Sequence, residues 1–123
     1  MKKKIKIMKA EMNNNEELVL QVEEGVSLSE MKPMGQMLVD SDHLSFIYVV
    51  DENDDYTYIS MPESIWPELK KAYEQRATVY ISDGREQLVL ADLHEELNYL
   101  IENIKGNSNY GDEMVGKVEA LFL

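Results

Sequence analysis

The sequence predicts an α+β fold in which an antiparallel sheet of about six strands, built from three hairpins, carries one middle helix and two C-terminal helices on one face. Three observations lead to this class. Apolar and polar residues alternate early in the chain, an Asp-Gly dipeptide separates two strand-like segments, and the C-terminal end has helical periodicity. Residues 1–123 have the size of one common domain and are expected to form a single α+β domain.

The first hairpin is predicted from alternation on both sides of an asparagine-rich turn. Apolar residues occupy every second position in residues 3–8 and again in 17–22, with lysines on the solvent side of the first strand. Residues 13–15, all Asn, tolerate left-handed backbone conformations. Residues 25–36 have no clean period, because proline and glycine interrupt them.

The middle of the chain predicts a second hairpin and a helix. Residues 44–50 are apolar on both faces, which indicates a central strand. An acidic turn at 51–55 leads into a strand at 56–61. Residues 62–75 follow with a helical stripe, and Pro67 is tolerated only in the first turn of that helix.

The third hairpin and the C-terminal helices have the clearest local signals. Residues 77–82 and 85–91 flank an Asp-Gly pair, which supplies the positive φ angles of a type I′ turn. Asp92 is the expected cap of the next helix, Gly106 its C-terminal stop and Asn109 the cap of the last helix. The predicted apolar stripes are Leu93, Leu97, Leu100, Ile101 and Ile104, and then Met114, Val115, Val118, Leu121 and Phe122.

Charge and composition exclude several classes of function. The formal net charge is −12, and much of the basic charge lies in the first nine residues, so the rest of the chain repels phosphate backbones and anionic lipid. No apolar run approaches the roughly 18 residues that span a bilayer. The absence of cysteine excludes disulfides, thiolate catalysis and Cys-ligated zinc. We expect a cytoplasmic protein that binds neither nucleic acid nor membrane.

Two stretches carry a resemblance to a known family. LVDSDHLSFIYVVDEN at residues 38–53 and LNYLIENIKGNSNYGDEMVGKVEALFL at residues 97–123 resemble the uncharacterised YjbL family of small proteins from low-GC Gram-positive bacteria. The likeness is most specific at VDSD and ENIKGNSNYG, and length and motif order match over nearly the whole chain. The resemblance implies a small bacterial cytosolic protein of unknown role and carries over no functional residues.

Catalytic signals are sparse. Asp40, Asp42 and His43 form the one cluster that joins carboxylates to imidazole, which suits either a cation or a general base. Hydrogen bonding within a turn is the alternative role for these residues. The acidic turn fails as a calcium loop, because Tyr56 stands at the glycine position and Pro62 at the position of the bidentate Glu. We therefore predict no catalytic residue, no metal site and no cofactor.

Two features suit recognition of a protein partner. Phe46, Tyr48, Tyr56 and Tyr58 share one face of the second hairpin if Val50 pairs with Tyr56. That face is either an exposed patch or is buried beneath the helices.

The loop that contains Asn107, Asn109 and Tyr110 is the second feature. Its Asn and Gly residues serve either recognition or only reversal of the chain between two helices.

The sequence thus predicts a non-enzymatic, acidic interaction or regulatory protein that binds a protein partner through these aromatic and loop residues. One alternative is a small metal-dependent enzyme that uses Asp40, Asp42 and His43. The other is a structural homodimer, and the sequence leaves the choice between monomer and homodimer open.

Overall fold

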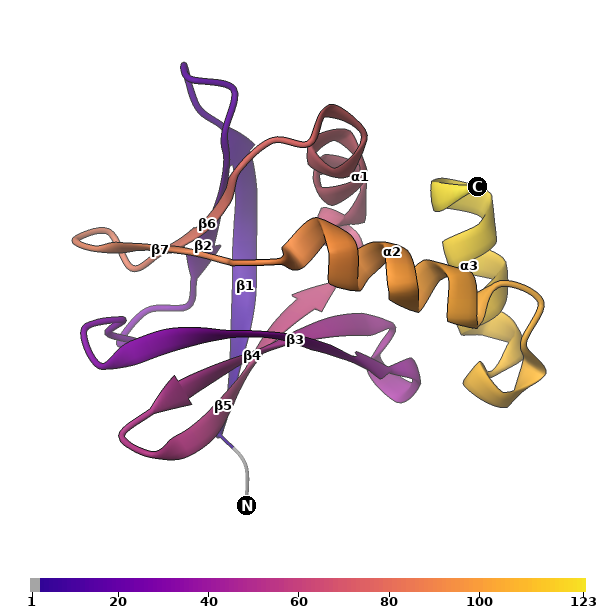
Figure 1. Ribbon diagram of the computed structural model, residues 1–123, viewed down its shortest axis with the longest axis horizontal. Helices are drawn as coiled ribbons and strands as arrows, with labels where there is room; N and C mark the ends of the chain where they lie inside the picture. The colour runs from indigo at the N-terminus through magenta and orange to yellow at the C-terminus, as the bar shows by residue number, and fades with distance from the viewer. Residues whose placement is uncertain (1–2) are drawn as a thin grey trace.

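The computed structural model describes residues 3–123 and confirms the α+β class (Figure 1). The strands are β1 (Lys3–Met12), β2 (Leu18–Val22), β3 (Met31–Asp40), β4 (Ser45–Glu52), β5 (Asp55–Pro62), β6 (Val79–Ser82) and β7 (Gln87–Val89), and the helices are α1 (Trp66–Gln75), α2 (Leu93–Ile104) and α3 (Asp112–Phe122). Within the described residues, no helix is long and apolar enough to cross a membrane.

The sheet is mixed and has 7 strands, in the order β3-β4-β5-β1-β2-β6-β7. The three predicted hairpins, β1–β2, β4–β5 and β6–β7, are present and antiparallel. The prediction of a purely antiparallel sheet of about six strands is wrong, because β1 pairs with β5 and β2 pairs with β6 in parallel. The first hairpin lies between the other two, and this long-range order has no local signal in the sequence.

The strand that the sequence did not predict is β3, which begins within the segment 25–36 that has no clean period. Its pairing with β4 is interrupted between Pro33 and Gln36, so proline and glycine fall where the ladder is irregular. Because β3 is an edge strand, a proline without an N–H group is tolerated there. The sheet curls until its two edge strands, β3 and β7, lie close together.

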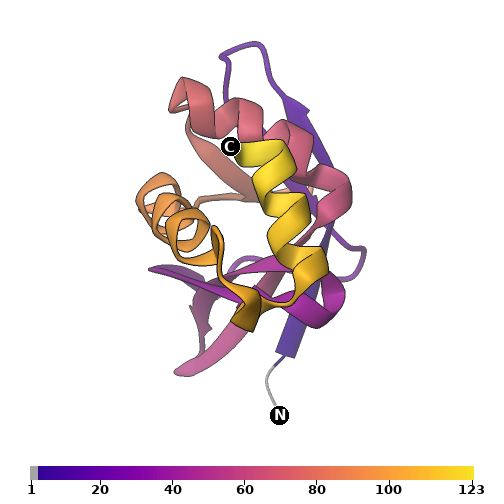
Figure 2. The same cartoon turned by 90° about the vertical axis from the view of Figure 1, so that its right-hand side faces the viewer.

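The three helices pack on the inner, concave side of the sheet, as Figure 2 shows from the helical side. Trp66 at the start of α1 is buried, and its indole N–H donates to the carbonyl of Met61 at 3.1 Å. Its ring lies 4.8 Å from the ring of Phe46 on β4 and 6.1 Å from that of Phe122 on α3. This aromatic group joins two helices to the central strands.

The predicted helix caps differ from the observed ones. Asp92 precedes α2 in a left-handed conformation, with φ of 62°, and makes no side-chain capping bond. Its carboxylate lies against Gly35 of β3 instead, where an added Cβ would come within 2.8 Å of Asp92 Oδ2. Asn109 lies inside a 3₁₀ turn, Ser108–Tyr110, and Gly111 precedes α3. Neither predicted cap therefore acts as one: Asp92 lies against β3, and an additional 3₁₀ turn separates Asn109 from the start of α3.

Candidate functional site

The register of the β4–β5 hairpin decides which aromatic side chains reach the surface. Val50 pairs with Thr57, and Asp51 pairs with Tyr56. The turn is therefore two residues long, with Asn53 and Asp54 both at positive φ, 55° and 65°. The predicted pairing of Val50 with Tyr56 across a five-residue turn is wrong by one residue, which places alternate side chains on opposite faces.

Phe46 and Tyr48 consequently face the helices, and both are 0% exposed. The hydroxyl of Tyr48 donates to the carbonyl of Ala91 at 2.6 Å and accepts the N–H of Gly35 at 3.2 Å. Burial, with a smaller contribution from nearby carboxylates, raises the pKa of Tyr48 to about 12, so the hydroxyl stays protonated. Of the two possibilities left open for the aromatic face, burial beneath the helices is therefore correct for Phe46 and Tyr48.

Tyr56 and Tyr58 lie on the opposite side of the sheet, which we call the outer face. The side chains of β4 and its neighbours that point to this face include Leu38, Ile47 and Val49. Ile47 and Val49 are only 3% and 2% exposed, although they point away from the helical core. Their strand neighbours cover them, since Leu38 pairs with Ile47 and Tyr58 pairs with Val49. The outer face is therefore apolar at its centre.

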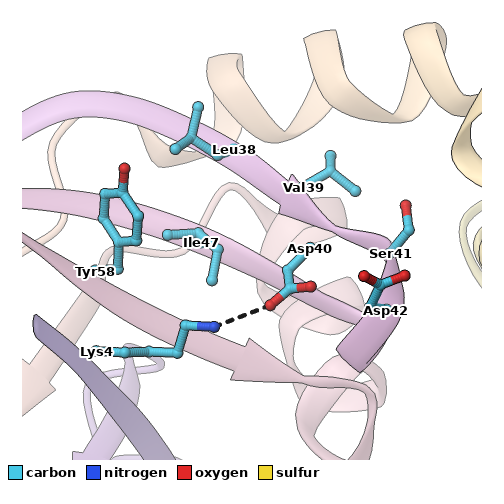
Figure 3. Close-up of a pocket in the computed structure, with 8 residues that line it drawn as sticks. All are labelled: Lys4, Leu38, Val39, Asp40, Ser41, Asp42, Ile47 and Tyr58. Carbon is cyan, nitrogen blue, oxygen red and sulfur yellow. Dashed lines mark hydrogen bonds and ion pairs between the residues drawn. The ribbon is translucent and has the colours of Figure 1, made fainter. Parts of the chain in front are cut away.

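A first hollow of about 430 Å³ opens on this face (Figure 3). Leu38, Ile47 and Tyr58 form its apolar wall, and Lys4, Asp40 and Asp42 supply charge. As Figure 3 shows, Lys4 extends from β1 toward Asp40 at the end of β3, and their charged atoms lie 3.0 Å apart. An ion pair thus crosses the outer face from one side of β4 and β5 to the other.

A second hollow of about 350 Å³ lies beside the first and shares Lys4 with it. It is lined by Lys4, Lys6, Glu23, His43, Ser45, Ser60 and Pro62. The pairing of β1 with β5 places Lys6 beside Ser60, and the pairing of β4 with β5 places Ser45 beside Pro62. Three strands therefore contribute to this hollow.

Asp40 links the two hollows. Its carboxylate accepts hydrogen bonds from Lys4 Nζ at 3.0 Å and from His43 Nδ1 at 2.9 Å, as well as from the backbone N–H of His43. Partial burial opposes ionisation of Asp40, but the bonds from Lys4 and His43 outweigh it and lower the pKa of this carboxyl below its ordinary value. Asp40 is therefore a charged centre that orients an imidazole.

The predicted cluster of Asp40, Asp42 and His43 is brought together only in part. Asp40 and His43 are in direct contact, and Asp40 also accepts the backbone bond expected of a turn residue. Across residues 3–123, no group of three His, Cys, Asp or Glu side chains could hold a metal ion. The arrangement orients the imidazole ring of His43 against the carboxylate of Asp40.

The loop after α2 lies in the helical layer, at the opposite end of the molecule from the β4–β5 turn (Figure 1). Asn107 accepts from the N–H of Asn109 at 3.0 Å and donates to the carbonyl of Asn103 at 3.2 Å. Tyr110 packs against the edge of the core, whereas Asn109 is exposed. These bonds reverse the chain between α2 and α3, and the two predicted recognition features are separate surfaces.

Sequence reasoning did not identify Lys4, Lys6, Leu38 or Ser60 as site residues. The alternation of β1 correctly placed lysines on its solvent side, which was the available signal. The partners of those lysines could not be found this way, because β5 and β3 are brought to β1 only by the long-range order of the sheet.

Together, the fold and this face define a class of small α+β protein: a curled, mixed sheet with helices on its concave side and an uncovered, hollowed outer face. Within that class the chain belongs to UPF0738, a family of unknown function whose model matches residues 5–122.

Full-length relatives agree with this assignment. The UPF0738 protein YjbL of Bacillus subtilis (strain 168) is 45% identical over 100% of both chains. A UPF0738 protein of Bacillus velezensis is 46% identical, again over 100% of both chains, and one of Geobacillus sp. (strain WCH70) is 34% identical over 100% of this chain and 99% of its own. The resemblance to the YjbL family is confirmed. No solved structure matches the chain.

Proposed function

We propose that the protein is a non-enzymatic interaction protein that binds a segment of a protein partner on its outer face. The observation that carries the proposal is the first hollow, in which an apolar wall lies beside the exposed carboxylate of Asp42, on the side of the sheet opposite the three helices of residues 3–123. A hollow of about 430 Å³ is large enough to take a bulky side chain of a partner.

The apolar part of the surface suits an anchor residue. Leu38 is 36% exposed and Tyr56 is 43% exposed, and both flank the nearly buried pair of Ile47 and Val49. Tyrosine offers a large contact area at a low cost in conformational entropy. A partner side chain that enters the hollow displaces water from Leu38, Ile47 and Tyr58 without requiring the strands to move.

The charge of the first hollow selects a basic partner. Asp40 is already bonded to Lys4 and His43, but the side chain of Asp42 is exposed at the rim. The β4–β5 turn, at the other end of this hairpin, carries the exposed carboxylate of Asp54, and the whole chain has a net charge of −12. The proposed ligand is therefore a segment with an apolar anchor beside Lys or Arg.

Site-specific photo-crosslinking in Bacillus subtilis tests this proposal. Residue 38 is replaced by p-benzoylphenylalanine, and Tyr99, which is 65% exposed on α2, is replaced in a matched control. We expect a discrete adduct from position 38 and none from position 99. We also expect Asp42→Lys to abolish the adduct, while Glu102→Lys, the same charge reversal on α2, leaves it intact.

Other outcomes would contradict the proposal. Equal labelling from both positions would mean that the outer face has no preferred partner. An adduct with twice the mass of the chain would identify a homodimer, which was the structural alternative.

A further inference from the structure

The second hollow has a charge balance unlike that of the first. Lys4 and Lys6 face one carboxylate, Glu23, whereas the first hollow places one lysine against two aspartates. Two lysines beside a single carboxylate are unexpected on a chain with a net charge of −12, in which anions are otherwise repelled. Whether this hollow can hold an anion depends on which of its groups are free.

The charged groups of this hollow are not equally available. Lys4 Nζ is bound to Asp40, while Lys6 Nζ makes no ion pair within residues 3–123. The carboxylate of Glu23 accepts the backbone N–H of Lys6 at 2.7 Å, and the two backbones are joined by a second bond of 3.2 Å. Glu23 is therefore fixed by the main chain, and the ammonium group of Lys6 is left free.

The hydroxyl groups differ in the same way. Ser45 Oγ donates to the carbonyl of His43 at 3.0 Å and is committed to the protein. Ser60 lies directly beside Lys6 across the β1–β5 pairing and is 7% exposed, with its side chain lining the hollow. A rotatable O–H donor next to a free ammonium group is a suitable pair for one carboxylate.

We propose that the second hollow binds a small aliphatic monocarboxylate, with its carboxylate on Lys6 Nζ and Ser60 Oγ and its alkyl part against Pro62. One free cation beside a fixed Glu23 favours a single negative charge over the double charge of a phosphate. The volume of about 350 Å³ accommodates a molecule of a few carbon atoms. This site does not depend on the proposed protein partner.

NMR titration of the full chain tests this inference, with butyrate, inorganic phosphate and butylammonium as probes at constant ionic strength. Butyrate is expected to shift the backbone amides of Lys6 and Ser60 in a saturable manner, with weaker binding of phosphate. Butylammonium has the same number of carbon atoms as butyrate but the opposite charge, and it is expected to leave these amides unchanged.

Two variants that remove the same charge distinguish a specific butyrate site from a general electrostatic attraction of butyrate to the protein surface. Lys6→Gln should weaken butyrate binding about 10-fold, because it removes a charge-assisted hydrogen bond. Lys9→Gln removes the same charge from the same strand, at a lysine paired with Glu11 and outside the hollow, and should leave binding unchanged. Both lysines are exposed, so both variants should fold.

Equal losses in the two variants, tighter binding of phosphate than of butyrate, or no saturable shift with butyrate would each overturn the inference. Binding of butyrate by a protein that shows no crosslinked partner would support this site and count only against the proposed function.

Discussion

The hydroxyl of Tyr48 lies 2.6 Å from the carbonyl oxygen of Ala91, 43 positions later in the chain. The same hydroxyl accepts the N–H of Gly35, so one buried side chain on β4 bonds both to edge strand β3 and to the segment that leads from β7 into α2. The two ends of the curled sheet are thereby joined through its interior. This bond helps explain how seven strands stay curled around the helices.

Loss of this link should destabilise the protein. Tyr48→Phe keeps the buried ring but leaves the Ala91 carbonyl and the Gly35 N–H without their partner. We expect a decrease of about 1–3 kcal/mol in the free energy of unfolding, measured with urea. Tyr99→Phe removes a hydroxyl from a tyrosine that is 65% exposed and should change stability by less than about 0.5 kcal/mol. Equal effects would mean that the Tyr48 bonds contribute nothing to stability.

Gly35 is sensitive for a second reason, since its φ is +63° and the carboxylate of Asp92 lies where a Cβ would stand. Gly35→Ala should cost about 1 kcal/mol for the positive φ and up to about 1 kcal/mol more for displacing Asp92. Gly25→Ala is the control, because φ is +85° and nothing lies within 4 Å of its Cβ. The double variant Gly35→Ala/Asp92→Ala should recover the excess loss, and thermal unfolding of these three variants and the native chain measures it. If Gly35→Ala and Gly25→Ala are equally destabilised, the Asp92 contact has no energetic consequence.

The three hairpins were predictable because each depends on residues close in sequence. The predicted two-residue type I′ turn at Asp83 and Gly84 is wrong in its length, because Ser82 pairs with Gln87 and only Gly84 of the two residues has a positive φ. The order of the hairpins in the sheet was not, because β1 contacts β5 through residues about fifty positions apart. The helix boundaries agree with the prediction to within a few residues. The predicted role of Asp92 as a cap is wrong, because Asp92 has a left-handed φ and its carboxylate lies beside Gly35 without a capping bond. Local sequence signals therefore predict the individual helices, strands and hairpins, but not which strands lie next to one another in the sheet.

The prediction that four aromatic side chains share one face was wrong because the length of the β4–β5 turn is ambiguous in the sequence. An acidic stretch of five residues fits either a five-residue loop or a two-residue turn, and Asn53 and Asp54 are residue types that tolerate the positive φ angles of the shorter turn. The shorter turn shifts the register by one residue, which buries Tyr48 and leaves Tyr58 on the outer face. Recognition of Asn-Asp as a turn pair would have corrected the prediction.

The C-terminal helix is held by its penultimate residue. Phe122 is half-buried, with its ring 5.9 Å from that of Phe46 and 6.4 Å from that of Tyr73. Phe122→Ala should lower the free energy of unfolding by about 2 kcal/mol, less than the roughly 3–5 kcal/mol of a fully buried Phe. Leu123→Ala, at a neighbour that is 59% exposed, should have almost no effect. Urea unfolding of both variants measures the difference, and a comparable loss in the two would show that α3 is not anchored through this ring.

Asp83 should give the protein a stability that depends on acid pH. Its carboxylate accepts the N–H groups of Arg85 and Glu86 in its own turn and of Leu28, 55 positions earlier, and these bonds lower the pKa of Asp83 to about 2. Because the pKa is lower in the folded state than in the unfolded state, at about 3.9, the stabilisation is complete above about pH 4 and is lost as the pH falls toward 2.

The variant Asp83→Asn isolates this contribution, because an amide oxygen still accepts hydrogen bonds but carries no charge. The difference in unfolding free energy between the native chain and Asp83→Asn should be constant from pH 7 to about pH 5 and shrink steadily between about pH 4 and pH 2. Asp42→Asn removes the same charge from an exposed side chain and is the control for the change in net charge. Urea titrations at each pH provide the measurement. If the difference for Asp83→Asn does not depend on pH, the negative charge of Asp83 contributes nothing to the stability that its three hydrogen bonds provide.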